Sequence, residues 1–482
     1  MNKNVFGSFV ISFFVATVLG GDNENLAVLR LPDVCAPRDV SVRWQVWVDD
    51  KPLELRHVTI DEKFPKSPAA LRKKGAWYDY GTCLLTGPRH FVVRADRDIS
   101  RLEVVPEKFG IVPKKIDDRT FSFEADNPFR LSFEVEGRVG ALHLFAARPD
   151  ALPDAAQPGV RRFGPGEHRP GTIYLGNDET LVLDEGAVVY GAVRIVGTNV
   201  VVCGTGILSG RDYKRFQRLD APGTKPTIGF FGVRNARQVR IRDISIECSC
   251  SWTLVIDDSS DVSVDGVKIL GSQMINDDGI DIVNSQHVTV SRTFVRTQDD
   301  GLALKGMSER KPMPPVSDIV MRDCEIWTDA ANPFRFGCES HASAIRGICI
   351  EDTDVLRYSP YVLPVTNMWT HGVILLQPSN DMPLEDVVFR NVRIRDCGVR
   401  EGLGEMFVLQ AAPKLSGTFR PKTRYTTVGS VRGVRLENVT LDGTRVRADS
   451  RRVYCSEKNV SDVTIDGIPI CAGSKTVGPQ RR

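Results

Sequence analysis

Two short acidic segments contain the residues best suited to chemistry. They read Asp277-Asp278-Gly279 and Asp299-Asp300-Gly301, and each runs directly into a short apolar stretch. Asp278 and Asp299 are 21 residues apart. If the chain winds in coils of about that length, these carboxyl groups meet in one small patch. Crowded carboxyls cannot all ionise at their normal pKa, so one can donate a proton while its neighbours activate water. Hydrolysis of a glycosidic bond requires this combination.

The sequence around the two acidic segments contains a repeated short strand pattern that can wind the chain in this way. A polar residue precedes alternating Val or Ile residues, and an Asp, Asn or Gly usually follows. The units start 23 and then 26 residues apart, and later intervals are longer. They occupy residues 239–246, 262–269, 288–290, 319–326, 348–355, 387–394, 434–441 and 463–468. Strands this short must stack on their neighbours to bury their apolar side chains.

The predicted fold is therefore all-β, a right-handed parallel β-helix solenoid preceded by a small N-terminal β-sandwich. Right-handedness follows from the general preference of parallel crossovers. A β-propeller or a large sandwich is the alternative, but propeller blades would show a longer and stricter repeat.

We expect five segments along the chain. Residues 1–21 have a lysine followed by an apolar run, as in a secretory signal peptide; a buried N-terminal strand is the alternative. Residues 22–150 contain alternating runs typical of a β-sandwich, and residues 151–171 read as a linker rich in Pro, Ala, Asp and Gly. Residues 172–470 form the β-helix, and 471–482 a C-terminal tail. The protein is expected to be secreted or periplasmic.

The composition restricts the partners. The formal net charge of +2 does not favour nucleic acid or an anionic membrane as a partner. The eleven cysteines fit no zinc motif, so no metal or other cofactor is predicted. Cys35 could pair with Cys83, and Cys455 with Cys471, after export. We expect a monomer whose partner is a polysaccharide or oligosaccharide.

Less specific interpretations of the acidic segments remain open. Asp-Gly is ordinary turn chemistry, and clustered carboxylates can bind calcium. Two Asp-Asp-Gly segments one coil apart favour catalysis over either alternative.

The motifs also resemble a known clan of enzymes. The segment 276–279, Asn-Asp-Asp-Gly, resembles the Asn-x-Asp-Gly motif of the polygalacturonase family, and Gln298-Asp299-Asp300 resembles its Asp-Asp motif. The segment 297–302 also resembles a rung of the dextranase/isopullulanase family of the same clan, which has an N-terminal β-sandwich. The resemblance covers roughly residues 172–441. It implies an inverting glycoside hydrolase in which Asp299 is the general acid and Asp278 and Asp300 activate water.

Two departures from the polygalacturonase pattern affect the expected substrate. Ala331-Asn332-Pro333 stands where that family has Gly-His-Gly, and Ile374 and Leu376 stand where it has the Arg and Lys that clamp a substrate carboxylate. Bidentate arginine is the usual device for such recognition. A neutral glucan such as dextran is therefore a candidate beside a pectin-like galacturonan.

Further polar residues near the acidic segments are candidates for binding the sugar. The predicted substrate-binding residues are Asn276, Asp277, Lys305, Asn332, Arg335, Glu339, His341 and His371. Trp252, Trp327 and Trp369 could stack on sugar rings or pack in the core.

Two other functions remain open at this point. A polysaccharide lyase on the same fold would need a base such as Lys305 or Arg335 and a uronic acid substrate. A non-catalytic carbohydrate-binding β-helix would use the acidic segments only as turns.

Overall fold

The computed structural model describes most of the chain between residues 43 and 470. The described residues are 43–60, 77–135, 140–220, 229–271, 276–307, 312–329, 331–338, 340–358, 372–395, 407–412, 427–456 and 458–470. The predicted signal peptide and C-terminal tail lie outside them. The described chain is almost entirely β-structure, with one short 3-10 helix, η2 (Glu107–Phe109). It contains no helix that is both long and apolar enough to span a membrane.

The first ten strands form two five-stranded sheets. One has the order β2 (Lys51–Leu53), β1 (Trp44–Val48), β5 (Arg89–Ala95), β8 (Thr120–Ala125) and β7 (Lys114–Lys115). The other has the order β3 (Arg56–Thr59), β4 (Trp77–Leu84), β10 (Leu142–Ala147), β9 (Phe129–Glu134) and β6 (Glu103–Val105). Both sheets contribute to one apolar core, in which the rings of Phe91 and Phe123 stack 4.8 Å apart. These ten strands are called the N-terminal domain below.

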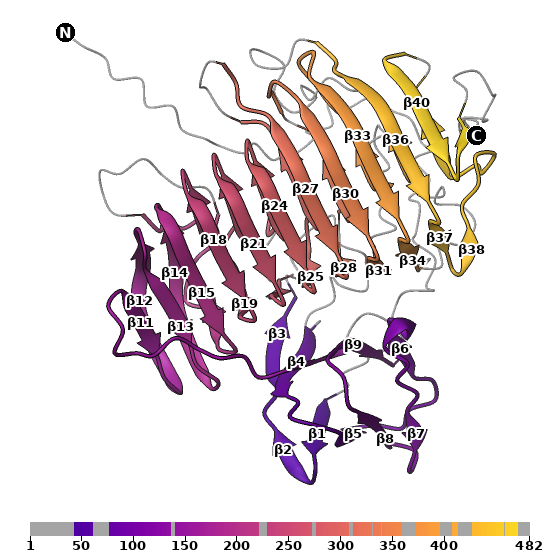
Figure 1. Ribbon diagram of the computed structural model, residues 1–482. Coiled ribbons are helices and arrows are strands. Elements are labelled where there is room, and N and C mark those ends of the chain that lie inside the picture. The colour runs from indigo at the N-terminus through magenta and orange to yellow at the C-terminus, as the bar shows by residue number, and fades with distance from the viewer. Residues whose placement is uncertain are drawn as a thin grey trace, which may run out of the picture.

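From residue 160 the chain winds in coils of three short strands, and each strand pairs in parallel with its counterpart on the next coil (Figure 1). The right-handed parallel β-helix predicted from the repeat is confirmed. Its strands form three ladders, which are stacks of equivalent strands from successive coils.

The first ladder is a 12-stranded sheet that contains the first half of each repeat unit of the sequence, and the second half of most units enters the second ladder. Its strands are β11 (Val160–Phe163), β13 (Thr180–Leu183), β15 (Thr198–Gly204), β18 (Arg237–Arg242), β21 (Ser260–Asp265), β24 (Gln286–Ser291), β27 (Val316–Arg322), β30 (Ile345–Glu351), β33 (Pro383–Arg390), β36 (Ser430–Glu437), β40 (Val460–Ile465) and the antiparallel β41 (Ile468–Pro469).

The other two ladders both start from the long strand β14 (Ala187–Ile195), which pairs with β12 (Gly166–Leu175). The second ladder continues through β16 (Ile207–Ser209), β19 (Ser245–Glu247), β22 (Lys268–Leu270), β25 (Phe294–Thr297), β28 (Glu325–Thr328), β31 (Asp354–Arg357), β34 (Arg393–Ile394) and β37 (Thr440–Leu441), which closes with β38 (Thr444–Arg445). The third continues through β17 (Phe231–Arg234), β20 (Leu254–Asp257), β23 (Ile280–Val283), β26 (Leu302–Lys305), β29 (Phe334–Phe336), β32 (Gly372–Leu376), β35 (Phe407–Ala411) and β39 (Val453–Cys455).

A column of residues with left-handed backbone runs along the first ladder. Each lies directly before an inward-facing Val or Ile, and the column includes Gln238, Asp261, His287, Asp318, Gly347, Asp386, Gly433 and Asp462. Asn, Asp and Gly tolerate this conformation best, which accounts for most of the column. The repeat in the sequence therefore reflects a local backbone requirement as well as a buried face.

The N-terminal domain packs against the outward face of the second ladder (Figure 1). Their shared apolar cluster includes Tyr78 and Phe145 from the N-terminal domain and Leu270, Phe294 and Trp327 from the coils. Buried ion pairs flank the cluster, among them Arg56 with Glu247 at 2.6 Å and Arg130 with Glu325 at 2.5 Å.

The cysteines show no bridge in the described part of the chain. None of the eight cysteines there forms a disulfide, and most of them are buried. Cys83 and Cys455 are among them, in contrast to the pairing considered above, and Cys35 and Cys471 lie outside the described residues. Burial raises the pKa of the Cys83 thiol to about 12, which makes it a poor nucleophile.

Candidate active site

The two acidic segments enter adjacent strands of the third ladder. β23 and β26 pair with Ile280 opposite Leu302, and the Gly279 amide donates to the Asp300 carbonyl at 2.8 Å. Asp300 therefore lies opposite Asp278, 22 residues along the chain, and not Asp299 as the 21-residue spacing suggested. The glycine after each Asp pair is required, because a Cβ on Gly279 would lie 2.6 Å from the Gly301 carbonyl oxygen.

Asp277, predicted as a substrate-binding residue, instead connects the two segments. Its side chain is fully buried, and its Oδ1 accepts hydrogen bonds from the Thr297 hydroxyl at 2.9 Å and the Gln298 amide at 2.8 Å. The Asp299 amide also donates to it at 3.2 Å. One carboxylate of the first segment thus fixes the backbone of the second.

Asp278 belongs to a buried cluster of opposite charges. The Lys305 ammonium lies 2.9 Å from Asp278 Oδ2 and 2.6 Å from Asp281 Oδ1. It also lies 3.6 Å from the centre of a Trp252 ring, so this tryptophan, considered above for sugar stacking, faces a cation. Asp278 Oδ1 and Asp281 Oδ2 have no hydrogen-bond partner in the described part of the chain.

Asp281 was not predicted, although the sequence contained a signal for it. It stands between Ile280 and Ile282, whose side chains both enter the core of the coil. Alternation therefore turns Asp281 outward, toward the same side as Lys305 on the next coil.

The surroundings give these carboxyls different proton affinities. Burial raises the pKa of Asp278 well above its usual range, and the carboxylates of Asp281 and Asp300 add to this effect, while Lys305 opposes it. Burial likewise raises the pKa of Asp281 to about 6. Burial acts the same way on Asp300, but Arg335, Lys305 and hydrogen bonds from Asn332 outweigh it and lower the pKa of Asp300. Asp300 is therefore the carboxylate held most firmly in its ionised form.

Asp300 is held by two of the predicted substrate-binding residues. Arg335 Nη1 lies 3.1 Å from Asp300 Oδ2, and the Asn332 side-chain amide donates to Oδ1 at 2.9 Å. The side-chain oxygen Oδ1 of Asn332 in turn accepts a hydrogen bond from the Gly372 backbone amide at 3.1 Å. Both residues therefore orient a carboxylate.

Asp299 differs from the other three acids because it is only half-buried, whereas Asp278, Asp281 and Asp300 are buried. Its Oδ2 accepts a hydrogen bond from the Asn276 amide at 3.3 Å, and Asn276 Oδ1 accepts one from Arg215 at 3.2 Å. Asp299 is thus the acid best placed to reach a bound molecule.

The chain is similar to a known family model and to solved structures. The model described as "Glycosyl hydrolases family 28" matches residues 190–325, which include both acidic segments. The structure is similar to Dex49A from Penicillium minioluteum, with 13% identity, a TM-score of 0.57, and coverage of 90% of this chain and 97% of that one. A family 28 exopolygalacturonase from Yersinia enterocolitica gives 12% identity, a TM-score of 0.41, and coverage of 86% and 99%. No curated protein matches the chain. The prediction of a glycoside hydrolase is confirmed.

The remaining predicted residues of this glycoside hydrolase are less closely connected to the acids. His341 is half-buried, and its backbone amide donates to the Gly306 carbonyl at 2.7 Å. Glu339, His371 and Trp369 lie outside the described residues. Trp327 is fully buried in the cluster beneath the N-terminal domain, so it packs there and does not stack on a sugar.

The positions expected to replace a carboxylate clamp need a correction. Ile374 and Leu376 both point into the core of the coil, so neither could present a charge to a substrate. The outward residue on that strand is Leu375, which pairs in register with Arg335. Leu375 is also apolar, so this strand presents no outward charge that could clamp a substrate carboxylate, as expected.

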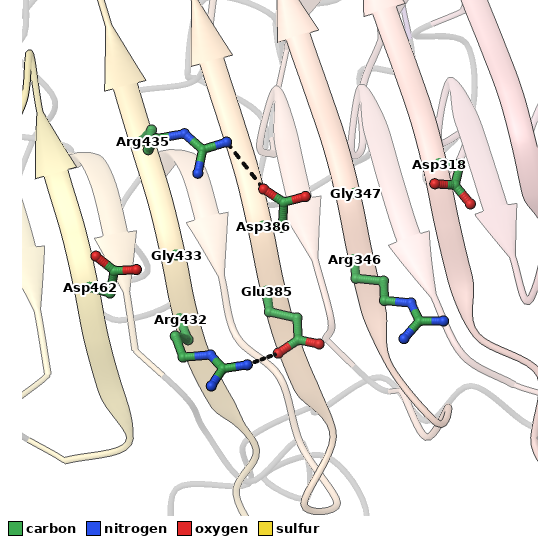
Figure 2. Close-up of a pocket in the computed structure, with 9 residues that line it drawn as sticks. All are labelled: Asp318, Arg346, Gly347, Glu385, Asp386, Arg432, Gly433, Arg435 and Asp462. Atoms are coloured by element: carbon green, nitrogen blue, oxygen red, sulfur yellow. Dashed lines mark hydrogen bonds and ion pairs between the residues drawn. The ribbon is translucent and has the colours of Figure 1, made fainter.

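A hollow of about 470 Å³ lies elsewhere, on the first ladder. Figure 2 shows the charged side chains that line it, with Arg432 paired to Glu385 at 2.7 Å and Arg435 to Asp386 at 3.1 Å. Gly347 lies in the same lining and has no side chain to fill it. None of the predicted site residues contributes to this hollow. Among the described residues, no three His, Cys, Asp or Glu side chains are grouped so as to hold a metal ion.

Proposed function

We propose that the protein hydrolyses a neutral polysaccharide with inversion at the anomeric carbon. Asp299 is the general acid, and Asp278 and Asp300 position and activate the attacking water. The accessible Asp299 beside a firmly ionised Asp300 supports this division of roles. Asp278 and Asp300 lie opposite each other on successive coils, which places their backbones about 4.8 Å apart.

In the proposed reaction Asp299 gives its proton to the glycosidic oxygen as the bond from that oxygen to the anomeric carbon breaks. Water attacks the same carbon from the opposite face and loses a proton to the carboxylate of Asp300 or Asp278. Lys305 assists this step by stabilising the ionised form of the buried Asp278 carboxyl with its positive charge.

The charge balance around the acids carries the proposal of a neutral substrate. Two cations near the acids are already engaged: Lys305 by Asp278 and Asp281, and Arg335 by Asp300. Three buried carboxyls, those of Asp278, Asp281 and Asp300, thus share these two cations, which disfavours a polyanion. The residues that stack in register with Arg335 on the next two coils, Leu375 and Gln410, are also uncharged. The Gln410 side chain accepts a hydrogen bond from the Gln377 side chain at 3.4 Å.

The test is release of reducing sugar from dextran, other neutral glycans and polygalacturonate. We expect activity on a neutral glycan, and a loss of about 1,000-fold in the Asp299→Asn variant, because a general acid contributes on this scale. Proton NMR of the first-formed anomer should show inversion. Full activity of Asp299→Asn would remove the acid assignment, and a preference for polygalacturonate would refute the neutral substrate.

The same assay separates hydrolysis from elimination. Lys305 and Arg335, the bases considered for a lyase, are both ion-paired with carboxylates. We therefore expect no rise in ultraviolet absorbance from an unsaturated product.

Export and oligomeric state are also part of the proposal. Residues 1–21 would direct the protein to a secreted or periplasmic location, and it would act as a monomer. N-terminal sequencing of exported protein and size-exclusion chromatography test these two points.

A further inference from the structure

We infer that the N-terminal domain is part of the catalytic support, because Tyr78 and His143 hold in position the segment that carries Asp299. This inference rests on the proposed role of Asp299. It assigns a function to a domain that would otherwise be read as a separate module beside the coil.

Arg296 is the first link between the domain and the acid. It lies on β25, three residues before Asp299, and its side chain is fully buried. Its guanidinium carbon lies 4.1 Å from the centre of the Tyr78 ring and 4.4 Å from the centre of a Trp327 ring. Arg296 Nε also lies 3.0 Å from Asp329 Oδ2. A buried arginine in contact with two aromatic rings and a carboxylate cannot shift without moving its strand.

His143 completes the enclosure of Arg296. Arg296 Nη1 lies 2.9 Å from His143 Nε2, and Ser132 Oγ lies 2.7 Å from His143 Nδ1. A guanidinium can only donate, so His143 Nε2 must accept, and the ring proton must reside on Nδ1. Burial and the neighbouring charge of Arg296 lower the pKa of His143 well below its usual range, which keeps the ring neutral.

Tyr78 provides a second, more direct link. Its hydroxyl donates to the Gly271 carbonyl at 2.8 Å, and the Gly271 amide donates to the Arg296 carbonyl at 2.8 Å. Gly271 also packs closely against Asp277, since a Cβ at Gly271 would lie 2.5 Å from Asp277 Oδ2. Asp277 in turn accepts the Asp299 amide. Each step from Tyr78 to the acid is thus a direct contact.

These contacts make Tyr78 and His143 positioning residues. Neither contacts the acids, so their loss should displace Asp299 and leave its chemistry intact. A displacement of a fraction of an ångström lowers the rate of the chemical step, whereas binding contacts elsewhere along the glycan persist. The expected signature is therefore a lower kcat with little change in KM.

Tyr80 provides a matched control on the same strand. It is as buried as Tyr78, and its hydroxyl also crosses to the coils, where it donates to Glu247 Oε2 at 2.7 Å. Glu247 lies on β19, one coil before the segment that contains Gly271 and the first acidic turn. Tyr78→Phe and Tyr80→Phe each remove one buried interdomain hydrogen bond, but only the first lies on the path to Asp299.

The experiment compares both variants with the unmodified full-length enzyme on its best glycan. We expect Tyr78→Phe to lower kcat about tenfold, with KM and Tm close to those of Tyr80→Phe, which keeps its kcat. His143→Phe should lower kcat at least as much, and His143→Gln should restore part of it because the amide oxygen can accept from Arg296.

The outcomes separate this inference from the proposed function. Equal kcat values for Tyr78→Phe and Tyr80→Phe in an active enzyme would overturn the positioning role and leave the hydrolase proposal intact. No hydrolysis by the unmodified enzyme would overturn the proposed function and, with it, the inference.

Discussion

Two clusters of buried charge lie on different ladders of the β-helix, and they are built in opposite ways. Beneath the N-terminal domain, Glu247 is surrounded by donors: Arg56 at 2.6 Å, the Tyr80 hydroxyl at 2.7 Å and the Ser209 hydroxyl at 2.8 Å. On the third ladder, Asp278 and Asp281 share the single ammonium of Lys305.

The difference is visible in their proton affinities. Burial alone would raise the pKa of both kinds of carboxyl, but the hydrogen bond from Arg56 and its charge outweigh it and lower the pKa of Glu247. At Asp278 burial prevails. A buried carboxylate with complete hydrogen bonding serves the structure, whereas an incompletely bonded one keeps the capacity to exchange a proton. The predictions below test this distinction.

The largest expected contrast is between Asp278→Asn and Glu247→Gln. Asp278→Asn should lower kcat/KM about 1,000-fold without lowering Tm, because it removes a charge that burial already disfavours. Glu247→Gln should lower the free energy of unfolding by about 3 kcal/mol, since Arg56 and its neighbours lose a buried counter-charge, and kcat/KM should persist below the melting range. Enzyme assays and thermal melts on both variants measure this.

The pH dependence of Glu247 gives an internal check. Because its folded-state pKa is lowered, its contribution to stability is present above its unfolded pKa and is lost as the pH falls through the folded value. The stability gap between wild type and Glu247→Gln should therefore narrow in acid. If Glu247→Gln lost activity and kept its Tm, a fully hydrogen-bonded carboxylate would be serving catalysis and not stability, which contradicts the distinction.

A smaller effect is expected at Asp281, which shares Lys305 with Asp278. In Asp281→Asn, Lys305 serves Asp278 alone and one neighbouring negative charge is lost, so the pKa of Asp278 should fall. The acidic limb of the kcat/KM profile should move to lower pH, with a loss at the optimum of about tenfold. Asp257→Asn is a suitable control, because Asp257 faces outward on β20 and pairs with Arg234 at 3.2 Å.

Asp281 should also influence stability in the opposite sense to Glu247. Its folded pKa of about 6 lies above the unfolded value, so its contribution is present below the unfolded pKa and is lost as the pH rises through 6. Asp281→Asn should therefore gain stability relative to wild type at pH 7 and lose that gain near pH 4. If Asp281→Asn lost activity equally at all pH values, with no shift of the acidic limb of the kcat/KM profile, Asp281 would have only a structural role.

The sequence was sufficient to predict the β-helix and the acidic site. The inward Val and Ile of each repeat unit, with a left-handed residue before them, leave little alternative to stacked coils. Asp278, Asp299 and Asp300 were predictable because two Asp-Asp-Gly segments lie one coil apart. The exact register was not, because a spacing of 21 or 22 residues is equally compatible with one coil.

The contacts within the site could not be predicted, for physical reasons. The two cations at the acids, Lys305 and Arg335, come from successive coils, and only the register shows which carboxylate each one contacts. The contact of Arg296 with Tyr78 and His143 joins residues more than 150 positions apart. No local pattern specifies such a pairing, since it depends on how two separately folded sheets pack.

The smallest effect on catalysis, and the sharpest test of the distinction, is expected at Lys268. This residue lies on β22, under the N-terminal domain, and is only 3% exposed. Among the described residues its ammonium makes one hydrogen bond, to the Asp243 carbonyl at 2.9 Å. Burial lowers its pKa to about 8. Its charged form therefore costs stability below pH 8, and this cost disappears as the pH rises toward the unfolded value near 10.5.

Lys268→Met should raise the free energy of unfolding at pH 7 by about 2 kcal/mol, less at pH 10, with unchanged kcat. Thermal melts at the two pH values measure this. Lys268 is incompletely bonded yet contacts neither acidic segment, so a loss of kcat in this variant would show that poor bonding marks function even far from the acids.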